Sequence, residues 1–407
     1  MTILVADYIY TPQGIIQAQG VAFDTHIKMI APLEELLQHY PDAKIERTPP
    51  YSVIYPGFIN THVHLEFSAN KTTLKYGSFM PWLDSVIANR DDLMKDCDNE
   101  MMAKECESML QSGITTFGAI SSFGLELEVC QQTPQKVIFF NELIGSNPAY
   151  ADVLYGDFIQ RVEASQLDTK KYKITPAIAI HSPYSVHPLL VNKAISLAKE
   201  NSMPLTAHLL ESPAEREWLE SGSGEFREFF ERYFNTTTPV TTINEFINAF
   251  ETYPSHFVHA TVAKPQELEH IKKYNHSIAH CPRSNRYLGC GRLDISKLDD
   301  ISLPYSVATD GLSSNDSLSI FDEMRAALML HSDMAVDVLA TKLIDATTKV
   351  PAKFFGLECG EIAVDKQADL TVVTLPDLPK DSSHIPLWSI IHTHKATQVY
   401  IDGERYV

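Results

Sequence analysis

Two patterns of hydrophobic and polar residues take turns through the middle of this chain. Short runs of apolar, β-branched residues are separated by stretches in which apolar residues recur at helical spacing, as at 190–201, 266–274 and 318–331. We interpret the runs as strands and the stretches as helices. The predicted strands are eight in number: 53–65, 115–120, 136–144, 173–181, 204–209, 256–261, 277–280 and 305–310.

Strands that alternate with helices are typical of a parallel sheet built from βα units, which is the α/β class. Eight such units predict a (β/α)₈ TIM-type barrel, whose active site would lie at the C-terminal ends of the strands. A doubly wound open sheet is the alternative. Nothing in the chain resembles Gly-x-Gly-x-x-Gly or a phosphate loop, so a nucleotide cofactor has no support in the sequence.

Both ends of the chain show a different pattern, in which short β-like pieces are broken by turn residues. The pieces are 3–10, 15–23, 360–362, 368–373 and 396–401. We expect the two ends to pack together as one small β-sandwich domain, formed by 1–52 plus 358–407. Residues 53–357 would then form the catalytic barrel.

The formal net charge of −19 makes a nucleic-acid partner unfavourable, because the phosphate backbone carries the same sign. The six cysteines form no Cys-x-x-Cys pair, which indicates free thiols in a reducing compartment. No apolar run approaches about 18 residues, and no basic region precedes the apolar N-terminus. We therefore expect a cytoplasmic protein without a membrane partner. The oligomeric state stays open, with a homodimer as one option.

Two histidines in the run 56–66 are the first candidates for chemistry. His62 and His64 are two positions apart on a predicted strand, so their imidazoles project to the same side and form half of a metal site. Two histidines on a solvated strand face are the simpler alternative. Further candidate ligands follow at the ends of later predicted strands: His181, His208, His259, His280 and Asp310. In a barrel, these ends would meet at one face.

Several motifs together carry a family resemblance over nearly the whole chain. They are Pro-Gly-Phe-Ile-Asn-Thr-His-Val-His at 56–64, His-Ser-Pro-Tyr at 181–184, Thr-Ala-His-Leu-Leu-Glu-Ser at 206–212, Val-His-Ala at 258–260, His-Cys-Pro-Arg-Ser-Asn at 280–285, Ala-Thr-Asp-Gly at 308–311 and Gly-Glu-Ile-Ala-Val-Asp-Lys-Gln-Ala-Asp-Leu at 360–370. The sequence resembles the amidohydrolase superfamily, in particular its branch of nucleobase, nucleoside and triazine deaminases and chlorohydrolases.

The resemblance implies one divalent metal ion, and its ligands would be His62, His64, His208 and Asp310. Three imidazoles and a carboxylate suit Zn²⁺ or Fe²⁺. Two-metal members of the superfamily use a carboxylated lysine at the end of the fourth strand, and no lysine ends that strand here. One ion is therefore favoured, although Glu142 leaves a bridging carboxylate open.

The resemblance also assigns catalytic roles. Glu211 would protonate the ring nitrogen beside the attacked carbon, and Asp310 would carry a proton from the attacking water to the leaving ammonia. His259 would orient the attacking group and stabilise the developing oxyanion. An ordinary helix-start carboxylate at Glu211 and a structural His259 stay as alternatives. His181 is assigned to substrate contact, and His280 to support of the ligands.

The runs 64–68, 79–83 and 141–145 resemble the members that deaminate 6-amino-6-deoxyfutalosine, an intermediate of the futalosine route to menaquinone. They differ from those that act on S-adenosylhomocysteine, methylthioadenosine or adenosine. The implied substrate is an adenine nucleoside with an aryl carboxylate on its tail, for which an arginine is the preferred partner. Arg90 is the first candidate, followed by Arg283, Arg286, Lys71 and Lys75.

Two other function classes remain open. One is a hydrolase of the same fold that acts on a C–Cl or cyclic amide bond, which would not need Glu211. The other is a non-catalytic barrel used for assembly. The non-catalytic barrel is disfavoured because all four predicted metal ligands are present.

Overall fold

The computed structural model describes residues 1–407, and no helix in it has both the length and the apolar character needed to cross a membrane. Its contacts divide the chain into two compact units. One unit contains 1–60, 106–117 and 319–407, and the other contains 61–105 and 118–318. The domain boundaries at 52/53 and 357/358 stay a prediction.

Eight strands follow one another around one sheet in chain order, from β6 to β13. Neighbouring strands from β8 to β13 pair in parallel. The strands are β6 (Phe58–Val63), β7 (Ile114–Ser121), β8 (Lys136–Leu143), β9 (Ile174–Ile180), β10 (Leu205–Leu209), β11 (His256–His259), β12 (Ser277–His280) and β13 (Tyr305–Val307). The amide of Asp310, beyond the last strand, donates to the carbonyl of His62 at 3.0 Å. The TIM-type barrel predicted from the sequence is confirmed.

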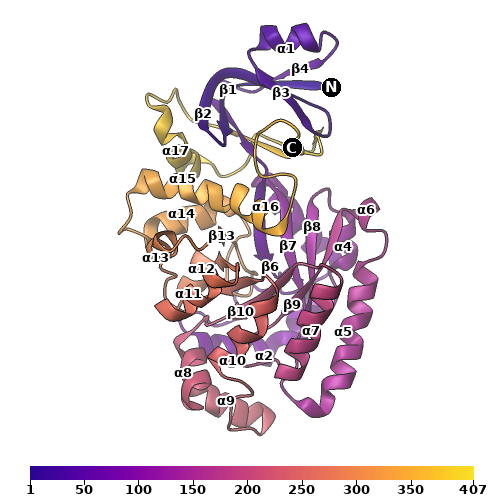
Figure 1. Cartoon of the computed structure of the whole chain (residues 1–407), viewed down its shortest axis with the longest axis vertical. Helices are drawn as coiled ribbons and strands as arrows, with labels where there is room; N and C mark the ends of the chain where they lie inside the picture. Colours follow the sequence, from indigo (N-terminus) through magenta and orange to yellow (C-terminus); the bar gives the residue numbers. More distant parts are fainter. The chain divides into compact units, whose positions relative to one another are not determined.

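Helices connect these strands, and α5 and α7 both pack against β9 (Figure 1). Between β6 and β13 they are α2 (Phe79–Asp96), α3 (Asn99–Gln111), α4 (Leu127–Gln132), α5 (Ala151–Ser165), α6 (Thr169–Tyr172), α7 (Pro188–Glu200), α8 (Pro213–Ser221), α9 (Glu225–Phe234), α10 (Ile243–Ala249), α11 (Pro265–Lys273), α12 (Pro282–Tyr287) and α13 (Ile295–Asp300), with short 3₁₀ turns η1 (Pro148–Tyr150) and η2 (Phe250–Thr252). Beyond β13 lie α14 (Ile320–Leu330), α15 (Val336–Ala346) and α16 (Lys349–Phe355).

The prediction of a single strand over 53–65 was wrong. The structure has two strands there, β5 (Ser52–Pro56) and β6, and Gly57 lies between them. A side-chain carbon on Gly57 would lie 2.1 Å from Thr115 Oγ1, so only glycine fits at this turn. The first of the two strands pairs with β14 (Leu370–Thr374) and thus belongs to the second sheet. Every residue of both strands is buried, so the sequence pattern alone did not reveal the break.

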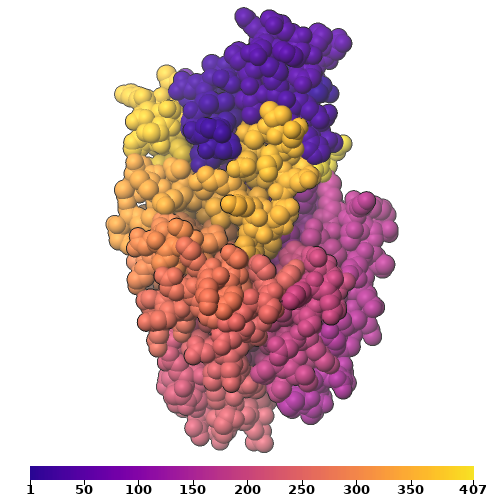
Figure 2. All heavy atoms as spheres, in the orientation of Figure 1, coloured from indigo at the N-terminus to yellow at the C-terminus, as the bar shows by residue number.

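The second sheet joins the two ends of the chain, as predicted. Its order is β16-β15-β14-β5-β1-β2-β3, with β4 paired to β1. The strands not yet given are β1 (Thr2–Thr11), β2 (Gly14–Phe23), β3 (Ile27–Ala31), β4 (Lys44–Arg47), β15 (Gln398–Ile401) and β16 (Glu404–Arg405), and the helices of the two ends are α1 (Leu33–His39), η3 (Ser382–His384) and α17 (Ile385–His392). Figure 2 shows atoms of the indigo N-terminal and yellow C-terminal segments side by side.

One predicted strand at the C-terminal end is absent, since 360–362 forms a bend. Gly360 has a φ of 87°, and a side-chain carbon there would lie 2.8 Å from the carbonyl oxygen of Thr348. A left-handed glycine in close contact with backbone ends an extended run instead of continuing it.

Candidate active site

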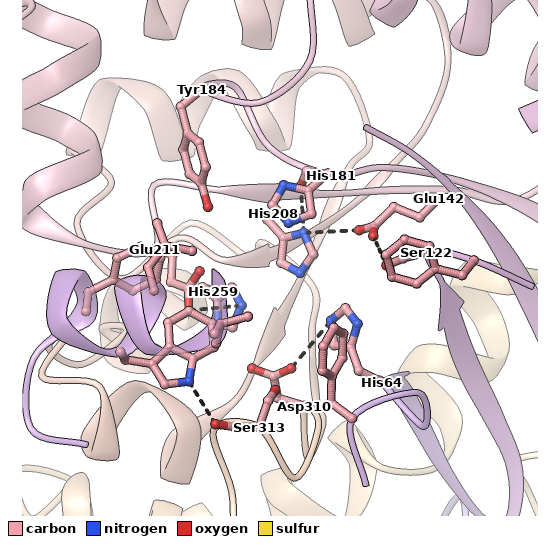
Figure 3. A pocket seen from close by; sticks show the side chains of 16 residues that line it. His64, Ser122, Glu142, His181, Tyr184, His208, Glu211, His259, Asp310 and Ser313 are labelled. Carbon is pink, nitrogen blue, oxygen red and sulfur yellow. Dashed lines mark hydrogen bonds and ion pairs between the residues drawn. The ribbon is translucent and has the colours of Figure 1, made fainter. Parts of the chain in front are cut away.

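Figure 3 shows three of the four predicted ligands, His64, His208 and Asp310, turned toward a common centre at the C-terminal ends of the barrel strands. The fourth, His62, is not drawn there and groups with each of the other three as a possible metal ligand. His62 lies on β6 and His64 directly after it, and their Nε2 atoms are 3.1 Å apart. The Oδ1 atom of Asp310 lies 3.6 Å from each of these nitrogens. His208, on β10, brings its ring centroid to 4.9 Å from that of His62. The structure therefore brings together all four residues predicted as metal ligands.

The ionisation states of these residues suit a cation. Burial lowers the pKa of His62, and it lowers the pKa of His208 well below the usual range, so both rings are neutral and keep a lone pair. Burial raises the pKa of Asp310, but the bond to His62 and the facing histidines outweigh it and hold that pKa well below its ordinary value. Neutral imidazoles beside an ionised carboxylate are the donor set that a divalent transition metal requires, so the residues fit such an ion.

The orientation of His208 bears on the number of ions. Its Nδ1–H donates to the carbonyl oxygen of His181 at 2.6 Å, which leaves Nε2 as the atom that can bind a metal. Glu142 lies 3.9 Å from this Nδ1, and its other oxygen accepts a 2.5 Å hydrogen bond from Ser122. Glu142, His181 and His208 form a second group of possible ligands, but the His208 nitrogen nearest Glu142 is already a donor. This arrangement favours a single ion.

Asp310 is held by three donors. The hydroxyls of Ser284 and Ser314 donate to its Oδ2 at 2.7 and 2.9 Å, and the amide of Gly311 donates to Oδ1 at 2.8 Å. Its own backbone is left-handed, with φ 59°. A non-glycine residue keeps such a conformation only when its surroundings fix it, and this is common at functional sites.

Glu211 and His259 face each other beside the four ligands. Glu211 Oε1 lies 3.6 Å from His259 Nε2, and both side chains are buried. Burial, together with the charges of Asp310 and Glu215, raises the pKa of Glu211 well above its usual range, so its carboxyl is protonated at neutral pH. His259 Nδ1 donates to Asn285 Oδ1 at 2.9 Å, and burial lowers the pKa of His259 to about 4. A protonated acid and a neutral imidazole thus lie next to the predicted metal ligands.

These side chains line a cavity of about 140 Å³. Its polar wall includes His64, Glu142, His181, His208, Glu211, His259 and Asp310. Its apolar wall includes Phe67, Phe79, Trp82, Leu83, Val86, Phe123 and Tyr184. Trp82 is fixed by its Nε1–H, which donates to the carbonyl of Ser313 at 2.8 Å. The cavity thus combines ionisable groups at one side with a surface suited to flat, apolar ligand groups.

His181, the predicted substrate contact, lies in the cavity wall. The hydroxyls of Ser185 and Ser182 lie 2.6 and 3.0 Å from its Nδ1 and fix the ring. Arg90, on α2, is not among the lining residues: its guanidinium pairs with Asp91, and its side chain is 45% exposed. The assignment of Arg90 to the substrate tail stays a prediction.

Sequence reasoning missed residues that hold the others in place, namely Glu215, Asn285, Ser284, Ser314 and Ser185. One of them carried a readable signal. Ser-x-x-Glu at 212–215 has the spacing of a capping box at a helix start, and α8 begins there. Asn285 and Ser284 each contact a partner 26 residues away, which local spacing does not reveal. Ser185 and Ser314 contact residues four positions earlier, but outside any helix, so helical spacing does not reveal them either.

A model of the amidohydrolase family matches residues 53–405, which is most of the chain. The chain belongs to the amidohydrolase family. This finding confirms the resemblance given by the motifs. The metal-ligand geometry described above therefore lies in an amidohydrolase barrel.

Several proteins similar to this chain are deaminases. This amidohydrolase is 46% identical to the aminodeoxyfutalosine deaminase of a Nitratiruptor species, with 98% of each chain covered. It is 33% identical to an adenosine deaminase of Helicobacter pylori, over 97% of this chain and 96% of the relative. The crystal structure of Helicobacter pylori aminofutalosine deaminase in complex with methylthio-coformycin matches with a TM-score of 0.93, 32% identity and full coverage of both chains. The prediction of a hydrolytic deaminase is confirmed.

Proposed function

We propose that this amidohydrolase converts 6-amino-6-deoxyfutalosine and water to futalosine and ammonia, as a step toward menaquinone. The observation that carries the proposal is the buried acid Glu211 facing His259 beside four converging metal ligands. The 46% identical aminodeoxyfutalosine deaminase supports the choice of substrate. The substrate is a small adenine nucleoside, and the proposal keeps the sequence-based expectation of a cytoplasmic location.

His62, His64, His208 and Asp310 would hold one divalent ion, Zn²⁺ or Fe²⁺. When bound, such an ion acts as a Lewis acid and lowers the pKa of water from 15.7 to about 7. The chain itself orients the ligands. The Nδ1–H of His208 is fixed by a carbonyl oxygen, and Asp310 is fixed by two hydroxyls and an amide. Prepositioned ligands keep the geometry of the site when the substrate enters.

Proton transfer then divides between two carboxyl groups. Asp310 is ionised and takes a proton from the attacking water, and it later delivers a proton to the leaving ammonia. Glu211 is protonated and donates to the ring nitrogen next to the attacked carbon, which accepts electron density as the C–O bond forms. When the C–N bond breaks and ammonia leaves, the proton of the new hydroxyl passes to Glu211. The ring nitrogen keeps the proton it received, and the attacked carbon becomes the ring carbonyl. Two carboxyl groups with opposite pKa shifts are suited to these opposite roles.

His259 assists through its free nitrogen. The bond from Nδ1 to Asn285 leaves Nε2 as an acceptor, which suits the orientation of an attacking water. Donation to an oxyanion would need the proton on Nε2 instead. We therefore assign His259 to the placement of the nucleophile.

The apolar side of the cavity would receive the nucleoside tail. Phe79 and Trp82 lie with their ring centroids 5.3 Å apart, and Tyr184 lies 4.6 Å from Phe226. An aryl group can stack on such a wall. No arginine or lysine lines the cavity, so recognition of the tail would begin with its ring and not with its carboxylate.

The test is a panel of adenine nucleosides given to metal-replete protein, with the ultraviolet change from adenine to hypoxanthine as the signal. We expect the largest kcat/KM for aminodeoxyfutalosine, and we expect Glu211→Gln to keep its metal and lose at least about 100-fold in kcat. Silence on every adenine nucleoside, together with turnover of a chlorotriazine or a cyclic amide, would replace the proposal with one of those hydrolase activities.

A further inference from the structure

Glu215 lies behind the proposed proton donor and does not line the cavity. It is the third residue of α8 and is 1% exposed. Its Oε1 accepts the amide of Leu210 at 2.9 Å, and its Oε2 accepts the amide of Glu211 at 2.7 Å. A capping-box glutamate at this helix position would ordinarily bond the N-cap residue, which is Ser212. Here the carboxyl group bonds the Ser212 backbone and also accepts the amides of the two residues before it, Leu210 and Glu211.

The same peptide segment is held from the other side. The hydroxyl of Thr261, after β11, donates to the carbonyl oxygen of Glu211 at 2.6 Å and to that of Cys290 at 2.9 Å. Both hydrogen-bonding groups of the Glu211 backbone are therefore bound. Leu210 is left-handed, with φ 50°, and a branched side chain rarely adopts this conformation without support. The Glu215 carboxylate provides that support directly at the Leu210 amide.

We propose that Glu215 is a positioning residue, whose two carboxylate oxygens fix the Leu210–Glu211 backbone so that the Glu211 carboxyl faces His259 and the reacting ring nitrogen. The inference rests on the proposed function, in which Glu211 is the proton donor. It adds a residue that contacts no reacting atom and acts only through the placement of another. The distance that it controls is the 3.6 Å between Glu211 Oε1 and His259 Nε2.

The chemistry requires a carboxylate at this position. Two amides that both donate need two acceptor atoms, and the two oxygens of a carboxylate supply them. Glutamine has the same size but offers one acceptor, and its NH₂ group would oppose the second amide. Glu215→Gln therefore removes one of the two bonds with little change in volume. Glu245, in the capping box of α10, occupies the same helix position, accepts the amide of Thr242 at 3.0 Å and does not line the active-site cavity. It is the matched control.

We expect Glu215→Gln to lower kcat about 10- to 100-fold, because a displaced catalytic group loses its alignment. The KM for aminodeoxyfutalosine and the metal content should stay within about twofold of the parent, since neither depends on the alignment of Glu211. Glu245→Gln should keep the parent kcat. A general loss of fold would lower the metal content and kcat together. A positioning role instead predicts a lower kcat with unchanged KM and unchanged metal content.

Thr261→Val is the second arm, for use if Glu215→Gln unfolds. It removes the hydroxyl that holds the Glu211 carbonyl while it keeps the size of the side chain. We expect a severalfold fall in kcat at unchanged metal content. A folded Glu215→Gln or Thr261→Val with the parent kcat would overturn the positioning role. If Glu211→Gln itself kept the parent kcat, the proposed function would fail first, so the two failures are distinguishable.

Discussion

At the level of single residues, the proposed metal site depends on the close contact between Gly311 and His64 as well as on the chemistry of its ligands. Gly311 follows Asp310, and a side-chain carbon at Gly311 would lie 2.7 Å from His64 Cβ and 2.9 Å from the His64 carbonyl oxygen. Contacts this short require one of the two segments to move. Because His64 is a proposed ligand, the displaced segment would include the metal site.

Gly311→Ala should therefore weaken metal binding by about 10- to 100-fold, the range found when residues that support metal ligands are changed. The measurement is metal content and reactivation of the apoprotein by added Zn²⁺. Gly156→Ala is the control, since no atom lies within 4 Å of its added carbon in the interior of α5. Equal metal affinity in the two variants would contradict the close-contact argument.

The protonation of Glu211 gives a second prediction at this scale. Burial raises its pKa well above the ordinary range, and the donor is active only while protonated. Activity should therefore be retained at neutral pH and lost as the pH rises through that raised pKa. A kcat profile of the metal-replete enzyme should fall on its alkaline side. A profile in which kcat instead rises with pH, at constant metal content, would show that Glu211 acts as a base.

The candidate ligands at the strand ends could be predicted from the sequence, but the residues that hydrogen-bond the site residues could not. His62, His64, His208 and Asp310 could be selected because each ends an apolar run, and a barrel brings such ends together. The bonds from Asn285 to His259 and from Thr261 to Glu211 join elements far apart in the chain. Such contacts depend on the tertiary structure, and the local pattern of the sequence does not show them.

At the scale of elements, the loop after β7 illustrates how a motif residue can act on a distant segment. Glu66 follows the metal-binding histidines, and its carboxylate accepts the amides of Ser122, Phe123 and Leu125 at 2.9, 3.0 and 3.1 Å. Phe123 lines the cavity, and Ser122 bonds Glu142. The carboxylate thus fixes the shape of one cavity wall.

Glu66→Gln should loosen that loop, because an amide cannot accept from all three backbone donors. We expect the KM for the nucleoside to rise about 3- to 10-fold with a smaller change in kcat, since the wall binds substrate and does not transfer protons. Steady-state kinetics on the metal-replete variant provide the measurement. An unchanged KM together with a large fall in kcat would place the role of Glu66 in the chemical step.

Element types were predicted better than element limits. The eight barrel strands were located from their apolar runs, but β5 and β6 were merged because both are buried on either side of Gly57. The strand expected at 360–362 failed because Gly360 takes a left-handed turn. In both cases a glycine in close contact with distant side chains or backbone marks the place where the predicted strand stops.

At the scale of the whole molecule, folding should be linked to the metal. Four ligands from three widely separated parts of the chain converge only in the folded state. A ligand that binds only the folded state adds about 4 kcal/mol of stability when its free concentration is about 1,000 times its dissociation constant. Chelation should remove this stabilisation.

We therefore expect a chelator to lower the thermal midpoint and to abolish activity, and we expect Zn²⁺ or Fe²⁺ to restore both. Glu211→Gln should show the same shift in thermal midpoint, since Glu211 is not a proposed ligand. Calorimetry with and without chelator gives the answer. If the chelator removes the metal and the thermal midpoint stays the same, metal binding does not stabilise the fold, and the prediction is wrong.

The most direct test of the central claim is ammonia release from 6-amino-6-deoxyfutalosine, measured against the number of metal ions bound per chain. We expect turnover to rise linearly with metal occupancy up to one ion per chain, with one ammonia formed for each adenine ring converted to hypoxanthine. Full turnover by metal-free protein, or none by protein that holds one zinc or iron ion per chain, would contradict this prediction.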